Sequence, residues 1–200
     1  MDMTVNEDIL QRSDVDGVAT LTLNRPKARN ALSTGLMAAL QTELDAIATD
    51  ASVRVAVIAA NGPAFCAGHD MREIRATPDK QAYIDLFAQC STLMLSITRL
   101  PQPVIARVHA TATAAGCQLV ATCDLAVAAA SAHFATPGVN IGLFCSTPMV
   151  AVSRNLGRKQ TMEMLLTGEM IDAEAARVGG LVNKVVDGAE LDDAFGAYCR

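Results

Sequence analysis

The sequence predicts a single α/β domain in which strands alternate with helices. Segments with the period of a strand and segments with the period of a helix follow each other from residue 17 to residue 130, in the order strand, helix, strand, helix, strand, helix, strand. The chain has 200 residues and a mass of 21.0 kDa, which fits one domain. No internal repeat or low-complexity linker interrupts the pattern, so residues 1–200 are expected to form one unit.

The first three elements are the clearest. Residues 17–24 alternate between apolar and polar side chains and are bounded by turn residues, as in a strand with one exposed face. Ser33 and Thr34 then open a helix whose Leu36, Leu40, Leu44 and Ile47 fall on one stripe. Residues 53–59 are nearly all apolar, which indicates a strand covered on both faces.

The middle of the chain continues this alternation. Thr77 and Pro78 supply an N-cap and a first-turn proline for a helix that runs to the break at Pro101. A β-branched strand at residues 104–108, a small-residue turn at 110–116, a short helix to Cys123 and a strand at 124–130 follow.

The last third of the sequence is mostly helical. Ser146 and Pro148 can start a helix that stops near Gly157, and residues 158–166 continue to a stop at Gly168. Asp172 is expected to cap a helix at 173–178. A short strand at 181–186 and a helix starting at residue 189 complete the pattern.

Composition argues against several classes of function. The formal charge is −5, hydrophobic residues make up 51% and charged residues 18%, which is ordinary for a globular domain and gives no sign of a nucleic-acid partner. The apolar runs are far shorter than the ~20 residues that span a bilayer. Because Asp2, Glu7 and Asp8 lie at the N-terminus, we also expect no signal or transit peptide.

The six cysteines show no CxxC spacing and lie mostly within apolar segments, which is typical of reduced cysteines that fill a core. We therefore expect a cytoplasmic protein. The three histidines lie far apart with no paired cysteines nearby, so no metal site is expected.

Two small-residue turns carry the chemical interest. Residues 61–73 follow a buried strand, and Asp70 with Glu73 forms a candidate capping box beside the backbone N–H of His69. Residues 113–118 follow another strand and start another helix. Two unpaired N–H groups at neighbouring helix starts can converge on one oxygen as an oxyanion hole. The alternative is that Gly68 and Gly116 only permit tight turns and close packing.

A family resemblance rests on an ordered series of motifs. Residues 24–33 (NRPKARNALS), 65–70 (FCAGHD), 115–119 (AGCQL) with 123–124, 134–137 (FATP) with 141–142, 166–168 and 180–182 together resemble the enoyl-CoA hydratase/isomerase (crotonase) superfamily. The match extends from Val18 to Val186. Residues 112–119 and 134–148 are most similar to the enoyl-CoA hydratase domain-containing proteins, a branch of poorly defined activity.

The resemblance implies a fold of repeated ββα units and an acyl-CoA or enoyl-CoA thioester as ligand, with coenzyme A as part of the substrate and no other cofactor. It also implies homotrimers or dimers of trimers and a role in fatty acid metabolism. The oxyanion-hole donors would be the backbone N–H groups of His69 and Ala115.

The family segments that line coenzyme A and the acyl group assign further substrate-binding positions to this chain. They are Lys27, Ala28, Arg29, Ala31, Phe65, Ala67, Gly68, Asp70, Met71, Gly116 and Asn140. Lys27 and Arg29 are candidates for contacts with phosphate, and the alternative is that both are solvated loop charges.

Two positions depart from the hydratase pattern. Gln118 and Gly138 stand where hydratases of this family have glutamates. Addition of water to a double bond needs a base and an acid, each worth about 10²–10⁴ in rate. Gln118 can orient a water but cannot take its proton, so efficient hydration is not expected.

Other residues could compensate for the missing glutamates. His69 is the best candidate, because an imidazole titrates near neutrality, unless its ring faces solvent or packs on a neighbouring helix. Cys145 and Ser146 would need a nearby base to act as nucleophiles. Asn140 could hydrogen-bond a substrate, and Asp124 is expected to pair structurally.

Two classes of function therefore remain. The chain is either an enzyme of hydratase lineage whose reaction needs few carboxylates or a non-catalytic acyl-CoA-binding protein. Consumption of an acyl-CoA separates them. Family members usually continue with a C-terminal helical segment, whereas this chain ends at Arg200 within the first of those helices, so we expect the trimerisation segment to be shortened after about residue 189.

Overall fold

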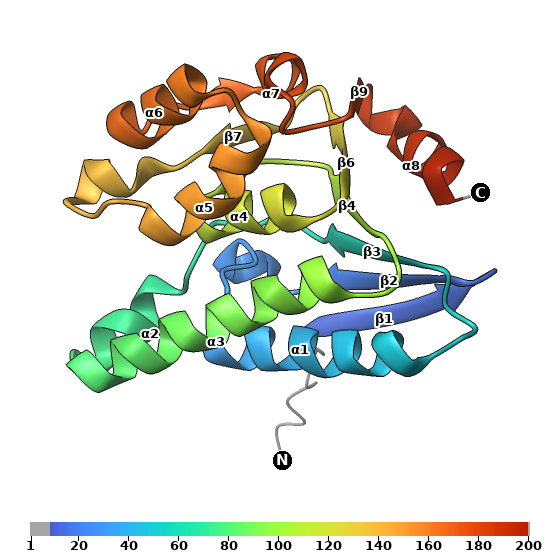
Figure 1. Cartoon of the computed structure of the whole chain (residues 1–200), viewed down its shortest axis with the longest axis horizontal. Helices are drawn as coiled ribbons and strands as arrows, with labels where there is room; N and C mark the ends of the chain where they lie inside the picture. The colour runs from blue at the N-terminus through green and yellow to red at the C-terminus, as the bar shows by residue number, and fades with distance from the viewer. Residues whose placement is uncertain (1–8, 200) are drawn as a thin grey trace.

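The computed structural model describes residues 9–199 and is built on a six-stranded sheet (Figure 1). Its strands lie in the order β1 (Leu10–Val15), β2 (Val18–Leu23), β3 (Val55–Ala60), β4 (Val104–Val108), β6 (Leu125–Ala129) and β9 (Lys184–Val186). β1 is antiparallel to β2, and all other neighbours pair in parallel. A second, three-stranded sheet has the order β5 (Ala112–Thr113), β7 (His133–Ala135), β8 (Ile171–Asp172).

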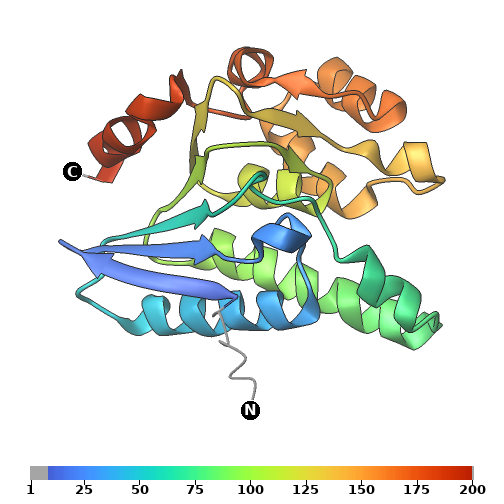
Figure 2. The same cartoon turned by 180° about the vertical axis from the view of Figure 1, so that it is seen from behind.

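Helices cover both faces of the main sheet. Helices α1 (Thr34–Thr49) and α3 (Lys80–Arg99) lie side by side on one face, and α8 (Leu191–Cys199) packs on the other face against β4, β6 and β9 (Figures 1 and 2). Helices α4 (Ala115–Thr122) and α5 (Ser146–Asn155) pack on each other beside α3. The remaining helices are α2 (Met71–Ala76), α6 (Arg158–Thr167) and α7 (Ala173–Gly179). The predicted α/β class is confirmed.

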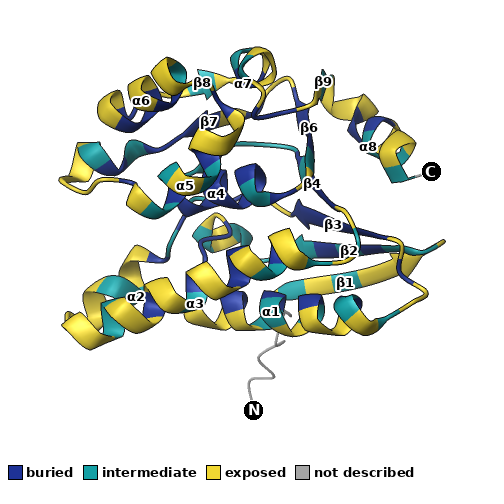
Figure 3. Ribbon diagram, in the orientation of Figure 1, coloured by how far each residue is buried: buried dark blue, intermediate teal, exposed yellow. Residues whose placement is uncertain are grey.

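The core follows the predicted periodicities. All residues of β3 are buried, while β2 buries every second residue. The predicted stripe of α1 is buried, and Ser33 caps this helix by accepting a hydrogen bond from the Leu36 N–H at 3.1 Å. Figure 3 shows the resulting division: β3, β4 and β6 are largely buried, whereas the edge strand β1 and the outer faces of the helices are largely exposed.

Several element boundaries differ from the predictions. Helix α3 is capped by Asp79, whose carboxylate accepts from the Ala82 N–H at 3.0 Å, rather than by Thr77, which ends α2. The strand expected at 181–186 starts only at Lys184, because the N–H of Leu181 bonds back to the Ala176 carbonyl as part of the helix end. The last helix begins at Leu191, after a short 3-10 turn.

Strands β1, β5, β7 and β8 were not predicted. β1 carries both Arg12 and Asp14 and is an edge strand, so it lacks the apolar alternation that marks a strand in sequence. The other three have only two or three residues each.

Asp2, Glu7, Asp8 and Arg200 lie outside the described residues. Among residues 9–199 no helix is both long enough and apolar enough to cross a membrane.

Asn30 joins the loop after β2 to the loop after β3. Its side chain is fully buried, its Oδ1 accepts from the Arg25 N–H at 2.8 Å, and its Nδ2 donates to the carbonyls of Asn61 and Ala64 at 2.7 and 2.8 Å. It also has a positive φ of 53°, a conformation that asparagine tolerates better than other non-glycine residues. One buried amide therefore holds the two loops that precede the candidate site.

Replacing this amide should be costly. Asn30→Ala leaves buried partners unsatisfied and strains the positive φ, so we expect the free energy of unfolding to fall by about 2–4 kcal/mol. Urea unfolding followed by circular dichroism measures the change. Asn140→Ala, at an exposed asparagine, is the matched control and should shift stability by less than about 0.5 kcal/mol. Equal effects of the two substitutions would contradict this role for Asn30.

Candidate functional site

The two small-residue turns lie in direct contact. The Phe65 N–H donates to the Thr111 carbonyl at 2.9 Å, and the Thr113 N–H donates to the Cys66 carbonyl at 2.9 Å. The Thr113 hydroxyl adds a bond to the Ala67 carbonyl at 3.1 Å. Segments that are more than 40 residues apart in sequence are thus hydrogen-bonded like two short strands.

Glycine is required where the turns meet. A Cβ at Gly116 would lie 2.1 Å from the carbonyl oxygen of Cys66, and one at Gly68 would lie 2.8 Å from the Cβ of Ala114. Gly68 also has a φ of +97°, which strains any other residue. The two glycines therefore do permit close packing, as the alternative interpretation states. The same close contact positions the backbone of the candidate site.

The backbone N–H of His69 points away from the segment that holds it. Leu32 donates to the Gly68 carbonyl at 2.8 Å and accepts from the Asp70 N–H at 3.2 Å. Because a trans peptide holds its N–H opposite to its C=O, the His69 N–H faces away from Leu32. Within residues 9–199 it has no hydrogen-bond acceptor.

The backbone N–H of Ala115 is free for the same geometric reason. The Ala114 carbonyl accepts from the Gln118 N–H at 3.0 Å, so the N–H of the same peptide points out of the N-terminus of α4. No acceptor for it lies in the described part of the chain. Ala114 has φ 50° and ψ −122°, a strained conformation worth about 1–3 kcal/mol, held by a bond from its N–H to the Ala135 carbonyl at 2.9 Å.

Asp70 anchors the first turn, although not through the predicted capping box. Its carboxylate accepts from the Arg72 N–H at 3.1 Å and pairs with Arg25 at 2.9 Å. Burial would raise the pKa of Asp70, but the bonds from Arg25 and the helix N–H groups outweigh it and lower the pKa. The second half of the box fails, because Glu73 accepts from the Thr34 N–H at 2.8 Å and ties α2 to α1 instead.

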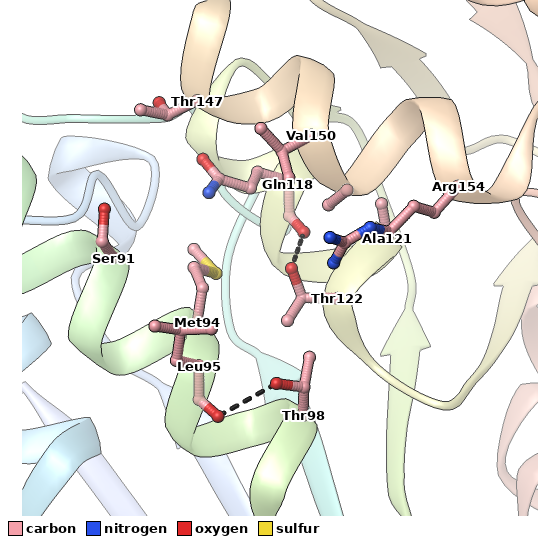
Figure 4. Close-up of a pocket in the computed structure, with 11 residues that line it drawn as sticks. Ser91, Met94, Leu95, Thr98, Gln118, Ala121, Thr122, Thr147, Val150 and Arg154 are labelled. Atoms are coloured by element: carbon pink, nitrogen blue, oxygen red, sulfur yellow. Dashed lines mark hydrogen bonds between the residues drawn. The ribbon is translucent and has the colours of Figure 1, made fainter.

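Gln118 lies one turn after Ala115 on the same side of α4. Its side chain is 6% exposed, and its Oε1 has no hydrogen-bond partner among the described residues. It opens into a pocket of about 260 Å³ between α3, α4 and α5 (Figure 4). The lining residues are Ser91, Met94, Leu95, Thr98, Gln118, Ala121, Thr122, Thr147, Val150, Ala151 and Arg154.

Residue 138, where the family resemblance implies a second glutamate, has no room for a larger side chain. A Cβ at Gly138 would lie 2.8 Å from both the Sγ of Cys145 and the carbonyl of Leu143. Burial raises the pKa of the Cys145 thiol, and the Gly138 N–H only partly opposes this. The pKa of the neighbouring Cys117 is raised by burial to about 12. Both thiols are therefore protonated near neutral pH and are poor nucleophiles.

The His69 ring does not line the Gln118 pocket. It packs edge-on against Phe87 of α3, with ring centroids 5.5 Å apart, and both ring nitrogens are buried without a hydrogen bond to any described residue. Burial lowers the pKa of His69, opposed to a smaller extent by the nearby Leu32 carbonyl. The His69 ring therefore packs on a neighbouring helix, which is one of the alternatives to a role as a base.

The other predicted positions divide by exposure. Lys27 and Arg29 are exposed, and neither side chain bonds to a residue of the described range, whereas the Phe65 side chain lies in the core. Ala28, Ala31 and Ala67 lie on the two loops held by Asn30, and Met71 is exposed at the start of α2.

Asn140 and Ser146 are exposed outside the Gln118 pocket. Asp124 has the expected structural role, because its carboxylate accepts from the Val104 N–H at 2.7 Å. No cluster of three or more His, Cys, Asp or Glu side chains within residues 9–199 could hold a metal ion.

Sequence reasoning missed the cation and the hydroxyls of the pocket. Arg154 is an isolated arginine on a helix, and Ser91, Thr98 and Thr147 are scattered along two elements. No local motif marks such residues, because only the packing of three helices brings them together.

The protein is a layered α/β domain in which each of two helix-starting turns leaves one backbone N–H without an acceptor in the described part of the chain. These features define a protein of the crotonase fold class. The profile of the enoyl-CoA hydratase/isomerase family matches residues 14–200, and the chain belongs to this family.

Known relatives agree with this assignment. The chain is 47% identical to human enoyl-CoA hydratase domain-containing protein 3, mitochondrial, over 179 residues that cover 90% of this chain and 59% of the relative. It thus spans about three-fifths of the length of this relative.

Solved structures show the same fold. A crystal structure of an enoyl-CoA hydratase from Mycobacterium smegmatis superposes with a TM-score of 0.94 at 58% identity, covering 96% of this chain and 75% of the other. Human enoyl-CoA hydratase domain-containing protein 3 gives a TM-score of 0.93 at 44% identity, covering 96% and 76%.

The contact at Gly116 can be tested by stability. In Gly116→Ala the new methyl group collides with the Cys66 carbonyl, so we expect the free energy of unfolding to fall by about 2 kcal/mol or more. Gly196→Ala, in α8 with open space around its Cβ, should instead stabilise by about 0.5–1 kcal/mol. Thermal unfolding of both variants checks the pair, and a harmless Gly116→Ala would refute the close approach.

The burial of His69 predicts a pH dependence. Since the folded-state pKa lies below the unfolded value of about 6.5, the unfolded chain binds the proton more readily, and stability falls as pH drops below about 6.5. The slope from one group is at most about 1.4 kcal/mol per pH unit.

His69→Leu should flatten the stability profile between pH 7 and pH 5, as measured by urea unfolding at each pH. The exposed His133→Leu is the control and should keep the wild-type profile. A wild-type slope in His69→Leu would show that the ring is not the group responsible.

Proposed function

We propose that this chain binds an acyl-CoA thioester and holds the thioester carbonyl between the backbone N–H groups of His69 and Ala115. The observation that carries the proposal is the contact of the two turns, which leaves two unpaired N–H groups at neighbouring helix starts. Backbone N–H groups at such places favour an oxygen that carries negative charge.

The arrangement suits chemistry through an enolate or a tetrahedral intermediate. A thioester carbonyl gains negative charge in either case, and each donor of an oxyanion hole is worth about 10²–10³ in rate. The donors are fixed by backbone bonds and by the Asp70–Arg25 pair, so little reorganisation is needed when the charge develops.

Efficient hydration does not fit the site. No carboxylate of residues 9–199 lines the Gln118 pocket, and Gly138 is covered by Cys145 and Leu143. Isomerisation, decarboxylation, or slow hydration through a water held by Gln118 needs fewer protein acids and bases. The closed position at Gly138 also favours a second candidate, a non-catalytic acyl-CoA-binding protein.

The family resemblance supports the rest of the proposal. We propose that the exposed Lys27 and Arg29, on the loop fixed by Asn30, neutralise the phosphates of coenzyme A. We also propose a homotrimer or a dimer of trimers that acts in fatty acid metabolism and uses no cofactor besides the coenzyme A moiety of its substrate.

Turnover of crotonyl-CoA, followed by loss of the enoyl absorbance, tests the missing-carboxylate argument. We expect little hydration by the unmodified chain and a rise of about 10²-fold in Gln118→Glu, because one positioned carboxylate is worth about 10²–10⁴. The substitution is made alone, since a side chain at residue 138 has no room.

Two controls accompany this test. Gln11→Glu makes the same change of charge on the edge strand and keeps an acceptor for Asn61, so it should leave turnover unchanged. Calorimetric titration of the same ligand reports binding without turnover. Rapid hydration by the unmodified chain would overturn the argument, and absence of binding would overturn the proposed function.

A further inference from the structure

The Gln118 pocket has one charged wall, and the proposed oxyanion hole does not use it. Among the described residues that line it, Arg154 is the only one with a charged side chain. It stands in the last turn of α5, while Gln118 stands one turn after the first residue of α4. Gln118 thus connects the pocket to the proposed thioester site, and Arg154 gives the pocket a positive charge.

Arg154 has no counter-ion in the described part of the chain. Its guanidinium forms neither an ion pair nor a hydrogen bond with any residue of the range 9–199, unlike Arg25 and Arg107, which pair with Asp70 and Asp192. Figure 4 shows the side chain turned along α5 toward Ala121 and Thr122 rather than away from the pocket. An unpaired arginine at a pocket wall is suited to bind a carboxylate, because its donors match both oxygens.

Neutral polar groups complete the wall. The hydroxyls of Ser91 and Thr147 make no hydrogen bond within residues 9–199 and can donate to a ligand, whereas those of Thr98 and Thr122 are already bonded to helix carbonyls at 3.0 and 2.7 Å. The Oε1 of Gln118 is buried without a partner. An amide here does not repel an anion, as a carboxylate would.

We propose that the preferred ligands are acyl-CoA thioesters of dicarboxylic acids, which carry a free carboxylate at the far end of the acyl group, and that Arg154 recognises this carboxylate. This inference rests on the proposed function and names its substrate class. The pocket volume of about 260 Å³ lies just below the ~300–1,000 Å³ usual for drug-sized ligands, which suits short acyl groups.

Matched pairs of saturated thioesters test the proposal without turnover. Butyryl-CoA and succinyl-CoA, hexanoyl-CoA and adipyl-CoA, and octanoyl-CoA and suberyl-CoA differ within each pair only at the far end of the acyl group. Calorimetric titration should show the dicarboxylate form binding about five- to tenfold more tightly at one chain length, since a partly exposed ion pair with bidentate geometry contributes this much.

Two variants assign the preference to Arg154. In Arg154→Gln the two thioesters of each pair should bind with the same affinity. Arg158→Gln, an arginine of α6 that does not line this pocket, should keep the wild-type preference. Raising the salt concentration should weaken the preference in the unmodified chain.

The outcomes separate the two proposals. Equal affinity within every pair, or a preference that survives in Arg154→Gln, overturns the inference and leaves the proposed function standing. Failure of every thioester to bind overturns the proposed function and this inference together.

Discussion

The close approach of Gly116 to the carbonyl of Cys66 determines the geometry of the candidate site. A single methyl group at residue 116 would separate the two turns, and with them the N–H groups of His69 and Ala115. The flanking bonds to Thr111 and Thr113 hold this contact in register, and Asn30 fixes the loops behind it. Backbone geometry, not side-chain chemistry, is thus the most highly constrained feature of the molecule.

Helix α4 links that constraint to the pocket. Its first N–H belongs to the candidate oxyanion hole, and its next turn presents Gln118 to the space beside α3 and α5. Gln118 and Gly138, which stand where the family resemblance implies acidic residues, are a neutral amide and a glycine without room for a side chain, while Arg154 adds a positive charge to the wall. The candidate site therefore has two backbone N–H groups that can polarise a carbonyl, beside a pocket with one cation among its described lining residues.

Sequence reasoning succeeded where a local rule applies. The buried β3 follows from its hydrophobic period, the capped α1 from its N-cap, and the turn at Gly68 from a positive φ that favours glycine. It failed where contacts between distant segments determine the structure. Glu73 bonds to α1 instead of to its own helix end, and Arg154 lines the pocket only because three helices pack together. Edge strand β1 was hidden by its charges, because an edge needs no apolar alternation.

The most direct test of the account concerns the thioester carbonyl itself. Difference infrared spectra of hexanoyl-CoA labelled with ¹³C at the carbonyl, recorded free and bound to the chain, report its polarisation without any turnover. If the N–H groups of His69 and Ala115 both donate to this oxygen, the C=O stretch moves to lower frequency on binding than it has in water. A bound ligand whose carbonyl band stays at the aqueous position would contradict the central claim.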